Sequence, residues 1–395
     1  MLQQMDQSKK WDKPKYRGGK KAAPSTNEQA EFGERAELDE QARTALRGFV
    51  ADFLDAGFNP LFAGLRRAIE READRVGDGH RRQYFYLTAW FLAAADARHA
   101  SPAIPTGPPD QQQQEEQESP FPLISAALDE HALALLNRHM QTALDEKRWR
   151  DLHAALLAFT QTLLTIQRMA ASADEGDREI AENIQQRVFY EEATQDRVVQ
   201  ALRGYVGQGF GYLDAATECA WVFVRMLEKF WKGSGGRLTV RGKRRRAGRR
   251  KRATAAGGAA GQDRPAPDVG HTADQSPPGS DDDDADADER PATAAASERA
   301  LNLPRFRAHL HSQPCLAAFL ALLHHYADLT AAQLKRCHRY LYTLAFKSDS
   351  NSLVLLFRAD ILLLFHRMLK GPAALSAEAE GYKDWETLVQ QIFRR

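Results

Sequence analysis

Apolar residues recur at intervals of three and four along most of this 395-residue chain, and this spacing constrains its fold more than any other feature. Such spacing places apolar side chains on one face of an α-helix, whereas a half-buried strand requires strict alternation. The sequence contains no series of segments in which apolar and polar residues alternate strictly. The pattern therefore predicts an all-α protein, with helices near residues 40–56, 60–76, 81–98, 123–144, 148–170, 177–202, 210–231, 314–328, 331–347, 351–370 and 381–393.

Several of these segments are apolar on more than one face, for example around Tyr84–Leu92 and around Ile361–Phe365. A helix that is apolar nearly all round is covered by other helices on several sides. Helices joined by short turns that share buried neighbours indicate an α-solenoid of armadillo or HEAT-like helical repeats. The chain shows no clean internal repeat, so this prediction rests on the helix pattern alone.

Three polar stretches divide the chain. Residues 1–38 form a basic N-terminal tail without the apolar core of a signal peptide. Residues 99–120 are rich in Pro, Gln and Glu, and residues 233–300 contain almost no large apolar side chains. Such compositions cannot offset the entropy of ordering and are expected to stay disordered. The predicted organisation is a helical-repeat region over 39–232, with 99–120 as a loop, a disordered basic and acidic linker over 233–300, and a continuation of the helical region over 301–395.

Residues 55–60 predict a tight turn between two helices. Gly57 is expected to end the first helix in the left-handed conformation. Asn59 is expected to cap the second helix, with Pro60 at its first position, where no backbone N–H is needed. The prediction is a hairpin of two helices, with Gly57, Asn59 and Pro60 as its structural turn.

The most apolar run, residues 353–369, contains Arg358 and Asp360 near its centre. Each such charge costs about 2.5–3.5 kcal/mol in the middle of a bilayer, so a buried soluble helix is favoured and no membrane partner is expected. Neighbours on a helix point apart, so Arg358 and Asp360 are expected to pair with other helices rather than with each other. The alternative is that they form a partner contact at the surface.

No motif for catalysis, metal binding or cofactor binding emerges. The glycine cluster at 207–211 lacks the ending of a phosphate loop and predicts a flexible turn that opens the next helix. Histidines gather between His309 and His366 without the paired spacing of metal ligands. Cys219, Cys315 and Cys337 lie far apart in apolar segments, which suits a reducing compartment. We therefore expect no enzyme, no cofactor and no metal site.

The net charge of +1 conceals two opposed blocks, KRRRAGRRKR at 243–252 and DDDDADADE at 281–289. A merely solvated run is the plain alternative for the basic block, but such dense charge repels itself. It therefore predicts a nuclear-import signal, an arm that binds nucleic-acid phosphates without base specificity, or both. The candidate residues are Lys243, Arg244, Arg245, Arg246, Arg249, Arg250, Lys251 and Arg252.

Four sequence blocks, taken in order, resemble the Timeless family, and most closely its fungal branch, the topoisomerase 1-associated factors. The blocks are FVADFLDAGFNPLFAGLRRAIERE with RRQYFYLTAWFLAA (49–72 and 81–94), GFGYLDAATECAWVFVRMLEKFWK (209–232), AAQLKRCHRYLYTLAFK (331–347) and VLLFRADILLLFHRMLKGP (354–372). Family members are much longer, so the chain is expected to correspond to a piece of their N-terminal half.

The resemblance implies a non-enzymatic scaffold of the replication fork-protection complex in the nucleus. Its implied partners are a Tipin-type subunit, a claspin-like checkpoint mediator, the replicative helicase, topoisomerase I and non-specific duplex DNA. Fork pausing and S-phase checkpoint signalling are the implied roles. An armadillo-like nuclear transport or chromatin adaptor is the alternative that the same composition allows, and an enzyme on a helical scaffold is a second one.

Overall fold

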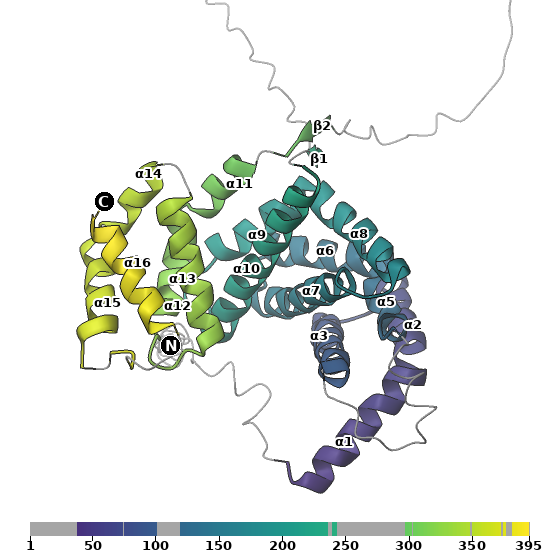
Figure 1. The fold of residues 1–395 in the computed structure, drawn as a ribbon. Helices are drawn as coiled ribbons and strands as arrows, with labels where there is room; N and C mark the ends of the chain where they lie inside the picture. Colours follow the sequence, from purple (N-terminus) through teal and green to yellow (C-terminus); the bar gives the residue numbers. More distant parts are fainter. Residues whose placement is uncertain are drawn as a thin grey trace, which may run out of the picture.

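The computed structural model describes residues 38–73, 75–100, 119–235, 239–242, 297–301, 303–347, 350–372, 374–376 and 381–394. The described part is built almost entirely from helices (Figure 1), which confirms the all-α prediction. The helices before residue 236 are α1 (Glu40–Asp52), the π-helical turn η3 (Phe53–Gly57), α2 (Phe58–Arg71), α3 (Asp78–Ala100), η4 (Phe121–Ile124), α5 (Ser125–Leu128), α6 (Glu130–Asp145), α7 (Trp149–Met169), α8 (Glu175–Tyr190), α9 (Glu192–Arg203) and α10 (Phe210–Gly233). The later ones are α11 (Leu303–Leu310), α12 (Gln313–Leu323), α13 (Ala331–Phe346), α14 (Ser350–Leu353), η5 (Val354–Leu356), α15 (Ala359–Lys370) and α16 (Tyr382–Arg394).

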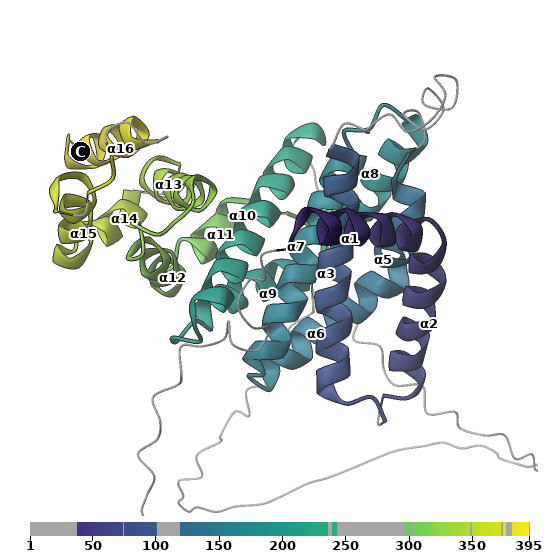
Figure 2. The same ribbon diagram turned by 90° about the horizontal axis from the view of Figure 1, so that it is seen from below.

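Successive helices stack side by side, from α1–α3 at one end to α15 and α16 at the other (Figures 1 and 2). This is the predicted arrangement of an α-solenoid. Within the first part, α7 packs against α3, α6, α8 and α10. Its Ala154, Ala155 and Ala158 are fully buried, and their small side chains let neighbouring helices approach on more than one face.

α10 joins the helices on either side of the 233–300 segment, because it packs against α7 and α9 before that segment and against α12 and α13 after it. The buried Arg336 of α13 fixes this contact. Its guanidinium donates to the Asp214 carboxylate (2.9 Å), the Asp214 carbonyl oxygen (2.8 Å) and the Thr217 hydroxyl (3.1 Å), all on α10. Gln333 donates to the same carboxylate. The helices on both sides therefore form one packed body.

Two short strands correct the prediction that residues 233–300 lack regular structure. β1 (Thr239–Gly242) pairs antiparallel with β2 (Ser297–Ala300), with Thr239 opposite Ala300. The pairing is stabilised by the buried Val240, and β1 packs against α8 and α9. Leu238 and Val240 are too short an apolar pattern to predict a strand within so polar a stretch. Residues 243–296 lie outside the described part, as do residues 1–37 of the predicted tail and residues 101–118 of the predicted loop.

The helix boundaries differ from prediction where a polar residue leaves the helical conformation. The helix expected over 177–202 is two helices, because the backbone is extended at Glu191. The helix expected from 123 begins as η4 and α5, and Asp129 then caps α6 by accepting the Ala132 N–H at 2.7 Å. α11 was not predicted at all. The turn predicted at 207–211 is confirmed, with positive φ at Gly207 and Gly209 just before α10.

The predicted hairpin at Gly57 is wrong. Gly57 has a φ of −103°, and the chain continues from α1 into α2 through the π-helical turn η3, in which the Phe58 N–H bonds to the Phe53 carbonyl. Pro60 supplies the physical reason, since it has no N–H for the Ala56 carbonyl and its ring crowds that group, which a wider turn relieves. Figure 2 shows α1 lying at a steep angle to α2 rather than folding back on it.

The predicted partners of Arg358 and Asp360 are also wrong. The helix expected over 351–370 is interrupted, and Arg358 has extended backbone just before α15. Because Arg358 lies outside the helix, its guanidinium reaches the carboxylate of Asp360 two residues later, at 2.7 and 3.1 Å. Both side chains are exposed, and their ion pair therefore lies at the surface. Among the described helices, none is sufficiently long and apolar to cross a membrane.

Candidate interaction surfaces

The residues singled out from the sequence lie in separate places. The eight basic residues of 243–252 fall outside the described part of the chain. Gly57, Asn59 and Pro60 lie together at the bend between α1 and α2. Near the opposite end of the stack, Arg358 directly precedes α15 and Asp360 lies in its first turn. These residues therefore do not form one site, and the candidate surfaces come from other residues.

Asn59 does not cap its own helix but bonds to residues that lie far away in the sequence. Its side-chain amide donates to the Pro122 carbonyl oxygen (2.7 Å), and its side-chain oxygen accepts the Ala126 N–H (3.0 Å). It thereby bonds to backbone groups at the junction of η4 and α5, where the Pro122 carbonyl oxygen also accepts the Ser125 N–H. The residue is structural, and it fixes the segment that follows residues 101–118 against α2.

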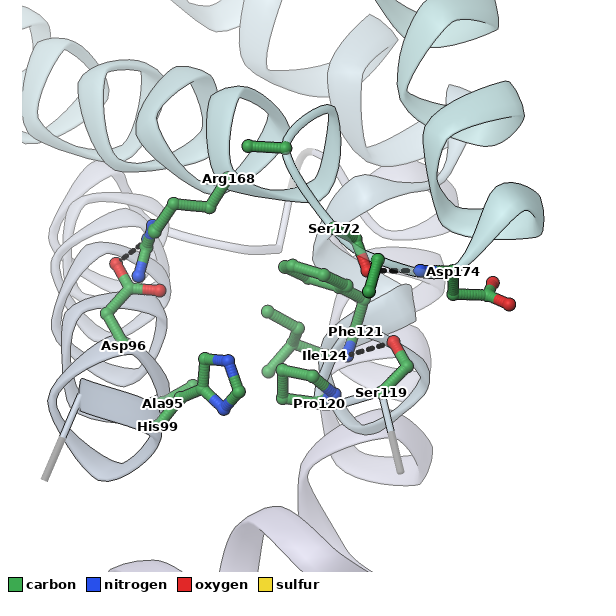
Figure 3. Close-up of a pocket in the computed structure, with 12 residues that line it drawn as sticks. Ala95, Asp96, His99, Ser119, Pro120, Phe121, Ile124, Arg168, Ser172 and Asp174 are labelled. Carbon is green, nitrogen blue, oxygen red and sulfur yellow. Dashed lines mark hydrogen bonds and ion pairs between the residues drawn. The ribbon is translucent and has the colours of Figure 1, made fainter. Parts of the chain in front are cut away.

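A cavity of about 400 Å³ lies between the end of α3 and the segment around η4 (Figure 3). On one wall, Arg168 of α7 forms an ion pair with Asp96 of α3. On the other, the Ser172 hydroxyl accepts the Asp174 N–H, which helps to shape the loop before α8. His99 also lines the cavity. Its charged pair is already matched internally, so the cavity offers little to a charged ligand.

A second groove, of about 340 Å³, lies between α10 and α13. Trp221, Val224 and Arg225 of α10 face it, at the three- and four-residue spacing of one helix face. The opposite wall consists of Lys335, Arg339, Tyr342 and Thr343 of α13 and of Lys347, which directly follows this helix. The groove therefore combines aromatic and aliphatic side chains with several cations, a composition that suits recognition of another molecule.

Large apolar side chains are exposed on the three helices at the first end of the stack. They are Leu46 and Phe49 on α1, Leu61 and Leu65 on α2, and Leu87 and Trp90 on α3. Beneath them lies a cluster of aromatic rings, in which Phe91 contacts both Phe53 and Trp90 at centroid distances of 4.8 and 4.9 Å. Exposed apolar groups on adjoining helices are typical of a contact surface.

The thiols and imidazoles of the described residues do not gather into a reactive site. Cys219, Cys315 and Cys337 are free and buried, and burial raises the pKa of Cys219 and of Cys337 to about 12. A thiol with a raised pKa is a poor nucleophile at neutral pH. Within the described ranges, no three His, Cys, Asp or Glu side chains are placed to hold a metal ion.

Comparison with known proteins relates the whole chain to one group. The family described as TOF1-like, helical domain matches residues 313–395, which span α12 to α16. The protein named topoisomerase 1-associated factor 1 from Aspergillus niger is 44% identical over 394 residues, covering 100% of this chain and 32% of the relative. Over its whole length the chain is similar to the topoisomerase 1-associated factor 1 family of fungi.

Other fungal members of this family give the same result. The relative from Phaeosphaeria nodorum is 43% identical over 395 residues, and that from Emericella nidulans is 44% identical over 395 residues. Each match covers 100% of this chain and 32% of the relative. The chain thus spans about a third of the length of these curated relatives, and the resemblance predicted from the sequence is confirmed. The π-helical bend, the cavity at the end of α3, the groove between α10 and α13 and the exposed apolar helices all lie within the residues that match these relatives.

Proposed function

We propose that the chain is part of a non-enzymatic scaffold that acts in DNA replication, within a fork-protection complex in the nucleus. The observation that carries this proposal is the match of the entire chain to proteins named topoisomerase 1-associated factor 1. A helical stack with grooves and exposed apolar faces supports a role in binding other molecules. The buried thiols and the pairing of the charged groups in the α3 cavity give no support to a catalytic role.

The proposed partners are topoisomerase I, a Tipin-type subunit, the replicative helicase, a claspin-like mediator and parental duplex DNA. The name of the relatives supports the first of these, because it describes association with topoisomerase 1. The others rest on the resemblance to the Timeless family. In this proposal the scaffold stabilises or pauses forks and supports S-phase checkpoint signalling, with related parts in DNA repair and meiosis.

Affinity purification of the tagged full-length protein from nuclear extract tests this proposal. We expect the Tipin-type subunit and helicase subunits to co-purify after nuclease treatment, and a version from which residues 39–395 are deleted to lose them. Recovery of nuclear transport receptors in their place would favour the transport adaptor instead. Recovery of the fork proteins by the deleted version would show that residues 39–395 are not the scaffold for them.

The basic residues of 243–252 are proposed to serve as a nuclear-import signal and as a non-specific DNA arm. If all eight charges contacted phosphates, log K would fall against log salt with a slope of about −7, which is an upper bound. The acidic run at 281–289 competes with DNA for the same charges, so a shallower slope is expected. Replacing the eight Lys and Arg residues by Gln should weaken duplex binding, reduce the slope and abolish nuclear entry.

Two measurements separate these roles: duplex binding across a salt series, and the cellular distribution of a fluorescent fusion. Unchanged binding with lost nuclear entry would leave an import signal alone. If neither property changes, the block is solvated charge, and any duplex contact must lie on the helical body. A variant with Gln in place of eight exposed Lys and Arg residues elsewhere on the helices controls for net charge.

A further inference from the structure

The groove between α10 and α13 has a floor that is fixed before any ligand arrives. Tyr340 and Phe319 stack with their ring centroids 3.8 Å apart, and the Tyr340 hydroxyl donates to the Leu310 carbonyl oxygen at 2.9 Å. On the neighbouring face of α13, Arg336 ties the helix to α10. Because three helices and a buried arginine hold these groups, the groove is preorganised, and little ordering would be needed on binding.

The rim of this groove carries positive charge that the rest of the described protein does not neutralise. Arg225, Lys335, Arg339 and Lys347 are exposed, and none forms an ion pair within the described part of the chain. One acidic residue lines the groove, Glu228, and its carboxylate is already held by the Arg307 guanidinium at 2.7 and 3.2 Å. Four cations thus surround an apolar floor without a matching anion.

The shape of the groove distinguishes between anionic ligands. Its half-buried Trp221 and Tyr342 and its floor of Phe319 and Tyr340 are apolar surfaces, which a phosphate backbone has no group to fill. A space of about 340 Å³ holds a large side chain or two, whereas a duplex requires an extended basic surface. A protein segment with acidic residues around an aromatic or aliphatic anchor supplies both chemistries.

We propose that the groove between α10 and α13 is a docking site for an acidic segment of a partner protein, with one large apolar side chain seated on Phe319 and Tyr340. The acidic residues of the segment pair with Arg225, Lys335, Arg339 and Lys347. The acidic run of this chain, at 281–289, fits less well because its largest apolar side chain is alanine. The site rests on the contacts of α10 to α13 and does not depend on the proposed role at the fork.

The test is a fluorescence anisotropy titration with the purified 395-residue chain. The probe is a short labelled peptide of Asp and Glu residues around one central Phe. We expect the double variant Lys335→Glu, Arg339→Glu to bind it at least about tenfold more weakly than the unaltered protein. The matched control is the double variant Arg367→Glu, Lys370→Glu, which reverses two exposed charges on α15 and should leave binding unchanged. Both altered residues in the groove are exposed, so thermal melts should remain unchanged.

Three further probes decide the identity of the ligand. A peptide with Ala in place of Phe should bind several-fold more weakly, because it leaves the apolar floor uncovered. A peptide of residues 278–290 of this chain and a short DNA duplex should both compete poorly. The proposal is overturned if the charge reversals do not affect the Phe peptide. It is also overturned if duplex DNA or the 278–290 peptide binds more tightly through the same two residues, since the groove would then serve DNA or the chain itself.

Discussion

Gly57 lies against the ring of Phe53, and a Cβ atom at this position would lie 2.8 Å from a ring carbon. The ring has little freedom to move, because it packs between Phe49, Phe58 and Phe91. The requirement for glycine is therefore one of space inside a π-helical turn, and the backbone conformation itself is open to any residue.

Gly57→Ala should destabilise the protein by about 1–3 kcal/mol, the usual range for an added group in a packed site. Gly64→Ala is the control, since Gly64 lies in α2, directly after the π-helical turn, with no atom within 4 Å of its added Cβ. That change should stabilise the protein by up to about 1 kcal/mol through helix propensity. Urea unfolding curves of the two variants measure the difference, and equal effects would contradict the crowding by Phe53.

A second single residue, His139, makes the stability of the fold depend on pH. Burial, together with the nearby Arg148 and Arg81, lowers its pKa from 6.5 to about 4, against a smaller opposite effect of Asp78. The imidazole lies against the ring of Phe85, with a centroid distance of 4.6 Å. In the unfolded chain the pKa returns to about 6.5. The unfolded chain therefore binds the proton more tightly, and stability falls as the pH falls from about 6.5 towards 4.

At pH 5 this linkage should cost the protein about 2 kcal/mol relative to pH 7. His139→Phe removes the titrating group and keeps the aromatic contact, so its stability should depend less on pH over this interval. Denaturation at pH 7 and pH 5 for both proteins provides the comparison. His311 also has a pKa near 4 and remains in both, so part of the pH dependence should persist. Identical pH dependence in the two proteins would show that His139 is not the proton acceptor.

At the scale of the elements, the helices could be predicted because their apolar spacing is a property of the local sequence. The places where the helices are interrupted could not be predicted in this way. Pro60 suits the first position of a new helix as well as a π-helical turn within a continuing one, so the local sequence does not choose between the two. Asn59 bonds to residues more than sixty positions away, a contact that only tertiary packing creates. The groove was missed for the same reason, since its walls come from helices separated by the whole 233–300 segment.

The contact between α10 and α13 should depend strongly on Arg336. Replacing it with Leu leaves the partly buried Asp214 carboxylate with the Gln333 amide but without its positively charged partner, and should cost about 3 kcal/mol. Arg339→Leu, on the same helix but exposed, should change stability by less than about 0.5 kcal/mol. Adding Asp214→Asn to Arg336→Leu should recover part of the loss, because the unpaired charge is then removed. Chemical denaturation of the single and double variants gives this coupling, and additive losses would contradict a direct ion pair.

At the scale of the whole molecule, the stack continues across the 233–300 segment through side chains rather than through the covalent connection. Arg203 of α9 donates to the carbonyl oxygen of His309 at 3.0 Å, and Phe223 of α10 contacts Phe306 of α11. Arg307 and Glu228 add an ion pair between the same parts. The strands β1 and β2 bring the two ends of the segment together at the edge of this body. Continuity of the chain between them is therefore not needed for the packing.

Cutting the chain within residues 243–296 should accordingly leave the two pieces associated. A specific protease site inserted after Gly261 allows a single cut, and the pieces should then elute together from a sizing column without denaturant. Limited proteolysis of the unaltered protein should give the same pair of fragments, with first cuts among the Lys and Arg residues of 243–252. In the Arg336→Leu protein the cut pieces should separate at a lower urea concentration, because one of the contacts that join them is lost. Separation of the unaltered pieces in plain buffer would show that the helices on either side of the segment are independent bodies.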